Sequence, residues 1–194
     1  MRVSVVPYDP TWPEAFERIR ATLSSALSRT QIVSIEHVGS TSVPGLAAKP
    51  IIDIDIVVLP EFLSQTCGLL SVSGYTYNPE IHGIDRFSFR YDAHKHDPGA
   101  VEPTEDGDIR RAVYVNIPSG TALRNHLAVK NVLLIDEELR DEYARVKMQL
   151  AGEEHLGIGH YGSKKNEVLK KIMRKSELLT TDDLLTIAKV NPSR

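Results

Sequence analysis

A chain of 194 residues is long enough for one domain with a small extension and too short for two large domains. Hydrophobic residues make up 41% and charged residues 25%, which excludes a disordered or fibrous protein. The 23 basic and 26 acidic residues give a net charge of −3, so there is no overall positive field to bind duplex nucleic acid.

The cysteine content and the length of the apolar stretches indicate the cellular compartment of the protein. With Cys67 as its one cysteine, the chain forms no intrachain disulfide and fits a reducing compartment. The most apolar stretch, residues 51–59, contains two aspartates and is far shorter than the roughly 20 residues of a membrane helix. Pro7 and Asp9 interrupt the N-terminus before a signal region is complete. We expect a cytoplasmic protein that does not enter membranes.

The first part of the chain predicts alternating helices and strands. Apolar residues recur at steps of three and four from Trp12 to Leu27, which predicts an amphipathic helix. Pro60 starts a second predicted helix that ends near Leu70. Short β-branched or alternating segments predict strands at residues 31–38, 51–59, 85–91 and 111–117.

From Thr121 onward the spacing is helical, so the fold class we expect is α+β. Residues 1–120 are predicted to form a mixed β-sheet flanked by helices, and residues 121–175 a helical part packed on the same domain. Residues 176–194 are predicted to form a short, loosely attached helical tail. The polar loop 92–109 is of the kind that moves or gates a site.

Candidate chemistry concentrates in a Gly39-Ser40 turn and in the strand that follows it. Asp53 and Asp55 are two residues apart, so both carboxylates leave one face of the strand. Such a pair repels unless a cation binds, and Mg²⁺ prefers one or two carboxylates together with substrate phosphates. Glycine allows a phosphate to approach backbone N–H groups closely.

These motifs resemble known families. A Gly-Ser turn followed by Asp-x-Asp on an apolar strand resembles the polymerase-β-type nucleotidyltransferases. The stretch EHVGSTSVPGLAAKPIIDI, from residue 36 to residue 54, resembles the GrpB family more closely. In some bacteria that domain is fused to dephospho-CoA kinase. The resemblance extends from residue 5 to residue 173 and includes residues 7–12, 86–90, 124–127 and 161–165.

The resemblance implies roles for individual residues. Asp53 and Asp55 would hold Mg²⁺ as the catalytic acids, and the Gly39-Ser40 turn would bind a triphosphate. A third acid normally comes from a later strand, where this chain has Asn116, a carbonyl ligand at best. The loop acids Glu102, Glu105, Asp106 and Asp108 are candidates to replace that acid.

Other polar residues are weaker candidates. Arg86 and Arg90 share one face of a strand and would bind phosphates if that face also carries Asp53. Lys49 and Lys165 are expected to be exposed. His82, His94, His96 and Asp97 lack the second pair of ligands that a zinc site needs, so solvated loop histidines are the favoured interpretation.

Three functions stay open at this point. The first is transfer of a nucleotidyl group from a triphosphate to a small molecule, a protein or an RNA end. The second is a nucleotide-binding module without catalysis, which Asn116 favours. The third is an accessory partner of an enzyme of coenzyme A synthesis, which the fused relatives suggest.

Overall fold

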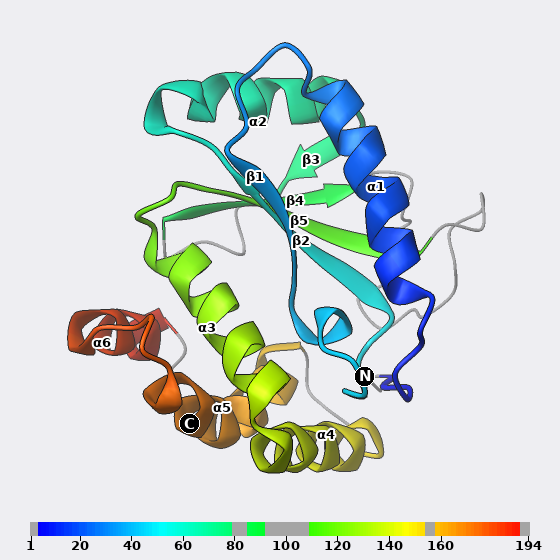
Figure 1. Ribbon diagram of the computed structural model, residues 1–194, viewed down its shortest axis with the longest axis vertical. Helices are drawn as coiled ribbons and strands as arrows, with labels where there is room; N and C mark the ends of the chain where they lie inside the picture. The colour runs from blue at the N-terminus through cyan, green and yellow to red at the C-terminus, as the bar shows by residue number, and fades with distance from the viewer. Residues whose placement is uncertain (1–3, 79–84, 92–108, 154–157, 191–194) are drawn as a thin grey trace.

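A five-stranded mixed sheet organises the fold (Figure 1). The computed structural model describes residues 4–78, 85–91, 109–153 and 158–190, without the side chains of 158–164 and 190. Strand order is β1-β2-β5-β4-β3, with β2 and β5 parallel and the other neighbours antiparallel. The strands are β1 (Ser34–Val38), β2 (Ile51–Val57), β3 (Tyr75–Tyr77), β4 (Arg86–Tyr91) and β5 (Arg110–Asn116). This arrangement confirms the expected α+β fold.

One face of the sheet is apolar and is covered by two helices, α1 (Trp12–Ala26) and α2 (Leu63–Val72). A short 3-10 turn, Pro60–Phe62, precedes α2. Side chains on alternate residues of β2 point into this core, and all three are fully buried: Ile52, Ile54 and Ile56. The alternation leaves Asp53 and Asp55 on the opposite face, which we call the carboxylate face.

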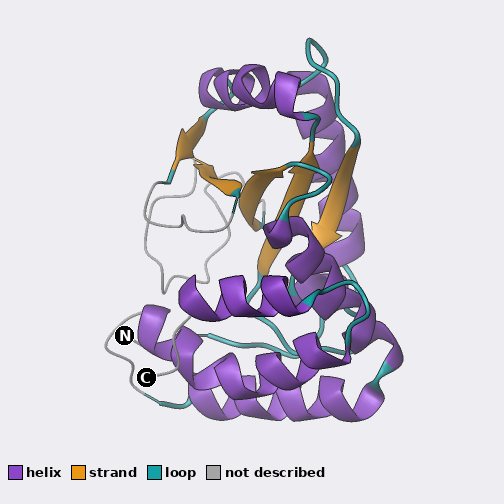
Figure 2. Cartoon of the chain, turned by 90° about the vertical axis from the view of Figure 1, so that its left-hand side faces the viewer, coloured by secondary structure: helices purple, strands orange, loops and turns teal. Residues whose placement is uncertain are grey.

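Three further helices pack beside the carboxylate face (Figure 2). They are α3 (Thr121–Ile135), α4 (Glu137–Ala151) and α5 (Ile158–Lys175). Their apolar side chains bury Val43 and Leu46, which follow a 3-10 turn at Ser40–Ser42. This second core joins the helices to the turn between β1 and β2, so their side chains approach the carboxylates.

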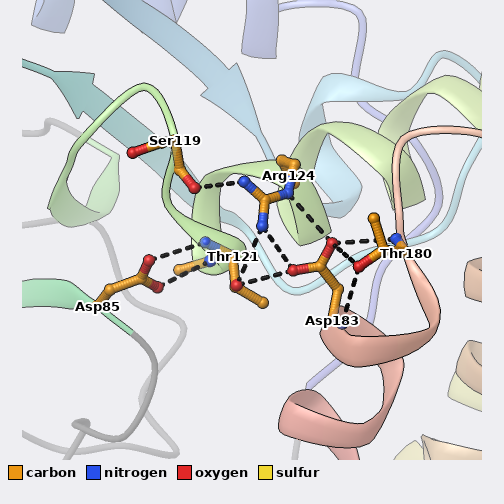
Figure 3. A network of polar contacts seen from close by, with 7 residues as sticks. Asp85, Ser119, Thr121, Arg124, Thr180 and Asp183 are labelled. Atoms are coloured by element: carbon orange, nitrogen blue, oxygen red, sulfur yellow. Dashed lines mark hydrogen bonds and ion pairs between the residues drawn. The ribbon is translucent and has the colours of Figure 1, made fainter.

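The C-terminal helix α6 (Thr181–Val190) is anchored, in contrast to the loosely attached tail that we expected. Asp183 is 3% exposed, and its carboxylate accepts hydrogen bonds from Arg124 Nη2 at 2.6 Å and Thr121 Oγ1 at 2.8 Å (Figure 3). Ile187 packs against Ala122 of α3. An ion pair together with an apolar contact fixes this helix on the N-terminal end of α3.

Two details of the strands differ from expectation. Strand β3 was not predicted, because three residues are too few to show an alternating pattern. The first strand begins at Ser34, three residues later than its apolar composition indicated. The polar loop lies outside the described residues apart from residue 109.

Candidate functional site

Asp53 and Asp55 form the centre of the candidate site. Asp55 is completely buried, whereas Asp53 is partly exposed. Burial raises the pKa of Asp53 to about 6, and repulsion from Asp55 acts in the same direction. The Tyr114 hydroxyl donates a hydrogen bond to Asp53 Oδ1 at 3.4 Å. Two neighbouring carboxylates of this kind favour binding of a proton or of a cation.

The Gly39-Ser40 turn lies directly against Asp53. Gly39 has φ +68°, and a Cβ at this position would lie 2.2 Å from Asp53 Oδ2, so both backbone conformation and space require glycine. Ser42 Oγ donates to the Gly39 carbonyl at 2.7 Å and stabilises the turn. Burial raises the pKa of Tyr143 on α4 to about 12, and the nearby Ser40 hydroxyl opposes that change. The turn therefore joins β1, β2 and α4 at one point.

Lysines from three segments approach Asp53. Lys147 of α4 is 3% exposed, and its ammonium lies 4.4 Å from the centre of the Tyr143 ring. Among the described residues, Lys147 Nζ has no hydrogen-bond partner. Burial lowers its pKa to about 6, Lys165 lowers it further and Asp53 opposes the change. Burial also lowers the pKa of Lys49 to about 8 and that of Lys165.

The expectation that Lys49 and Lys165 are exposed is wrong. Both side chains are partly covered, and the charge of Asp53 acts on the pKa of each. Packing of the C-terminal helices against the turn causes this burial, which local sequence does not encode.

A chain of hydrogen bonds connects β4, α3 and Asp55. His126 Nδ1 lies 2.9 and 3.0 Å from the two carboxylate oxygens of Asp55. Arg86 Nη1 lies 3.3 Å from His126 Nε2. Because a guanidinium donates and never accepts, Nε2 accepts this bond, and the ring proton is on Nδ1. His126 thus donates from Nδ1 to Asp55 and accepts at Nε2 from Arg86.

Strand register shows which of the predicted residues share the carboxylate face. Arg90 lies in the same row as Asp53, two strands away. Arg86 and Asn116 are cross-strand neighbours, one row beyond Asp55. Asn116 is completely buried, and neither atom of its amide has a hydrogen-bond partner among the described residues.

The position on β5 that pairs with Asp55 is Tyr114. The β5 residue beside Asp55 is therefore aromatic, and Asn116 lies diagonally from the acids, one row further along the sheet. The loop acids that we considered as replacements, together with the histidine group from His82 to Asp97, lie outside the described residues.

Several site residues were missed by sequence reasoning. His126 belongs to a segment that carried the family resemblance, but nothing local assigned it a role. Lys147 follows Tyr143 by four residues, so the two share a helix face, and that spacing was the available signal. Both contacts depend on how helices far along the chain pack on the sheet.

The described residues lack two features that would define the type of site. They contain no group of three or more histidine, cysteine, aspartate or glutamate side chains placed to hold a metal ion. None of the described helices has the length and apolar character needed to cross a membrane.

Residues 2–175 match the family described as GrpB protein. The chain is 33% identical over 175 residues to a UPF0157 protein of Halalkalibacterium halodurans, spanning 90% of this chain and 82% of that protein. A 59-residue segment is 46% identical to part of a dephospho-CoA kinase of Mycolicibacterium paratuberculosis, covering 29% of this chain and 14% of the kinase.

Solved structures share the fold. A conserved protein GrpB from Enterococcus faecalis is similar with a TM-score of 0.69 and 28% identity, covering 89% of this chain and 98% of that one. Cid1 in complex with its short product ApU is similar with a TM-score of 0.54 and 16% identity. The match covers 85% of this chain and 49% of Cid1, and it shows a nucleotidyltransferase-like fold.

Proposed function

The chain belongs to the GrpB family, and we propose that it binds a nucleoside triphosphate with Mg²⁺ on the carboxylate face and transfers a nucleotidyl group to an acceptor. The observation that carries the proposal is the ammonium of Lys147, buried near Asp53 without a hydrogen-bond partner among the described residues. A buried amine without a partner is costly to charge, and a bound anion would supply both the partner and the reason to hold the proton, so this arrangement supports an anionic ligand.

The shared fold supports a triphosphate as that ligand. Cid1 has RNA terminal uridylyl transferase activity. A second structure of Cid1 is similar to this one with a TM-score of 0.52. On this chain, the Gly39-Ser40 turn offers backbone N–H groups, and Lys147 and Lys165 offer positive charge on the neighbouring helices. The phosphates would lie between the turn and these helices.

The donor set beside the turn fits Mg²⁺. Asp53 and Asp55 supply two carboxylates, and the absence of a Cβ at Gly39 keeps Asp53 open to the turn. Mg²⁺ is commonly held by one or two carboxylates together with substrate phosphates, so a complete protein cage is not required. When bound, the ion would stabilise the charge that develops on the phosphates.

The proposed reaction is a phosphoryl substitution. An acceptor hydroxyl forms a bond to the α-phosphorus while the bond from that phosphorus to the bridging oxygen breaks. Pyrophosphate leaves with the electron pair, and the proton of the hydroxyl passes to water. Lys147 and Lys165 would balance the charge of the leaving pyrophosphate, and His126 would orient Asp55. A small molecule, a protein or an RNA end would be the acceptor.

A nucleotide-binding module without catalysis is the second candidate. On β5, Ala112 pairs with Asp53 and Tyr114 pairs with Asp55, and Asn116 lies one row beyond, so none of these positions carries a carboxylate. Without a third acid, binding would persist while activation of the acceptor fails. Asp53 and Asp55 are common to both functions, so binding and turnover have to be measured separately.

Calorimetry with ATP, GTP, CTP and UTP, each with and without Mg²⁺, tests the proposal. We expect at least one triphosphate to bind in a Mg²⁺-dependent manner, and Asp53→Asn to weaken it at least tenfold while the fold is retained. Asp141→Asn, at an exposed site on α4, is the matched control. Pyrophosphate release with mixed acceptors then separates the enzyme from the binding module.

The proposal fails if none of the four triphosphates binds at millimolar concentration, or if Asp53→Asn binds as well as the unaltered protein. A melting temperature for each variant excludes unfolding as the cause. A ligand at one hundred times its Kd should add about 2.7 kcal/mol to the free energy of unfolding, which is readily measured.

A further inference from the structure

Arg90 lies on the far side of the carboxylates from the proposed triphosphate position. Register places Asp53 beside Ala112 of β5, and Ala112 beside Arg90 of β4. Neighbouring strands are about 4.8 Å apart, so the Cα atoms of Asp53 and Arg90 are separated by about 10 Å. The three residues form one row across the carboxylate face.

The row of Asp53 is partly exposed along its length, since Asp53, Ala112 and Arg90 are all partly exposed. In the next row, Tyr114 is partly exposed, but Asp55 is completely buried and Ser88 is 3% exposed. Because alanine ends at Cβ, the side chain between Asp53 and Arg90 is short, and a ligand at Asp53 would extend over it toward β4.

Within the described part of the chain, the side chain of Arg90 has no partner, whereas the side chains of neighbouring arginines do. Arg86 donates to His126, and the Arg111 guanidinium lies 4.2 Å from the centre of the Tyr91 ring. Among the described residues, the Arg90 guanidinium makes no hydrogen bond, ion pair or ring contact. A partly exposed guanidinium that no described group engages is suited to a planar or tetrahedral oxyanion, which it binds with two parallel N–H groups.

The triphosphate has its own cations on the opposite side of Asp53. Lys147 belongs to α4, and Ser40 belongs to the turn after β1, whereas Arg90 is on β4 at the other end of the row. A group that approaches the α-phosphorus from the side away from the leaving pyrophosphate would lie over Ala112. Resting on the proposed function, we infer that the acceptor carries an oxyanion, a phosphate or a carboxylate, which Arg90 binds.

The test uses two small anions as probes. The full chain is saturated with Mg²⁺ and an α,β-methylene triphosphate, which blocks transfer and occupies the lysine side. Inorganic phosphate and acetate are then titrated separately. We expect one of them to bind and Arg90→Gln to weaken it at least tenfold. Arg90→Lys, which keeps the charge and loses the planar fork, should cause a smaller loss. The anion that binds identifies the acceptor as a phosphate or a carboxylate.

Arg145→Gln is the matched control, because Arg145 is an exposed arginine on α4 and also lacks a partner among the described residues. Arg145→Gln should bind the triphosphate analogue and the anion with the same affinities as the unaltered protein. Melting temperatures show that each variant is folded.

The inference fails if neither anion binds, or if the anion binds equally well to Arg90→Gln. It also fails if Arg90→Gln lowers the affinity for the triphosphate analogue itself, because Arg90 would then belong to the nucleotide site. A titration without the analogue separates this inference from the proposed function. Anion binding that depends on Arg90 in a protein that binds no triphosphate would refute the function and retain the oxyanion site.

Discussion

Replacing Lys147 with methionine should stabilise the ligand-free protein and remove triphosphate binding. The pKa of Lys147 falls from an ordinary value of 10.5 to about 6 on burial. At 1.36 kcal/mol per pKa unit, keeping this amine buried at pH 7 costs on the order of 5 kcal/mol. Methionine has a similar length and no charge, and at pH 7 the folded protein holds a mostly uncharged amine, so no cation–π energy is lost at the Tyr143 ring. The expected gain at pH 7 is therefore on the order of 5 kcal/mol.

The pH dependence of this gain has a definite sign. Between pH 6 and 10.5 the unfolded chain binds a proton at Lys147 that the folded protein does not, so the stability of the unaltered protein rises with pH. The cost of burial is complete below pH 6 and disappears above 10.5. The advantage of Lys147→Met should therefore shrink by about 1.3 kcal/mol per pH unit between pH 6.5 and 9.5.

Urea denaturation at pH 6.5, 8.0 and 9.5 measures the stability, and calorimetry with Mg²⁺ and the preferred triphosphate measures binding. Lys171→Met is the control, since the Lys171 side chain is 58% exposed and its stability difference should not follow this pH trend. A constant advantage across the pH range would show that Lys147 does not carry a buried, depressed amine. Retained triphosphate binding would remove Lys147 from the site.

Three further changes test other parts of the site. His126→Gln should weaken Mg²⁺-dependent nucleotide binding about tenfold in calorimetry, because Asp55 loses the group that orients it; unchanged affinity would contradict this role. Asn116→Asp should lower the melting temperature without metal and strengthen Mn²⁺ binding, whereas equal destabilisation with and without Mn²⁺ would show a purely structural asparagine. Asp183→Asn should lower the unfolding free energy by about 2 kcal/mol and speed amide exchange in residues 181–190; unchanged exchange would show that Arg124 does not anchor α6.

The parts of the site that sequence predicted are those that local periodicity encodes. Alternation along residues 51–57 separated Asp53 and Asp55 from the isoleucines of the core, and the structure shows that separation. Gly39 was selected for close approach, and the carboxylate of Asp53 lies where a Cβ would be. Both features are decided within one strand or one turn, so no knowledge of distant contacts was needed.

The residues that sequence missed depend on long-range packing. His126 meets Asp55 across 71 positions of the chain, and Lys147 meets the site because α4 packs on the segment that contains Val43. In the sequence, Lys147 appears as one polar residue in an amphipathic helix. The anchoring of α6 through Asp183 was missed for the same reason, since its partner lies 59 positions earlier.

The charges of the site do not neutralise one another. Asp53 is close enough to Lys147 to raise its pKa, yet the ammonium makes no hydrogen bond to that carboxylate or to any other described group. In a structural salt bridge the amine and the carboxylate would be in contact, because burying the two groups apart costs desolvation energy without the energy gained from contact. Asp55 meanwhile is held by His126, and burial has raised the pKa of Asp53. A Mg²⁺-triphosphate would relieve both conditions, since its cation meets the carboxylates and its phosphates meet the ammonium. The proposed ligand would thus account for the separation of Asp53 and Lys147, which their contribution to the fold does not explain.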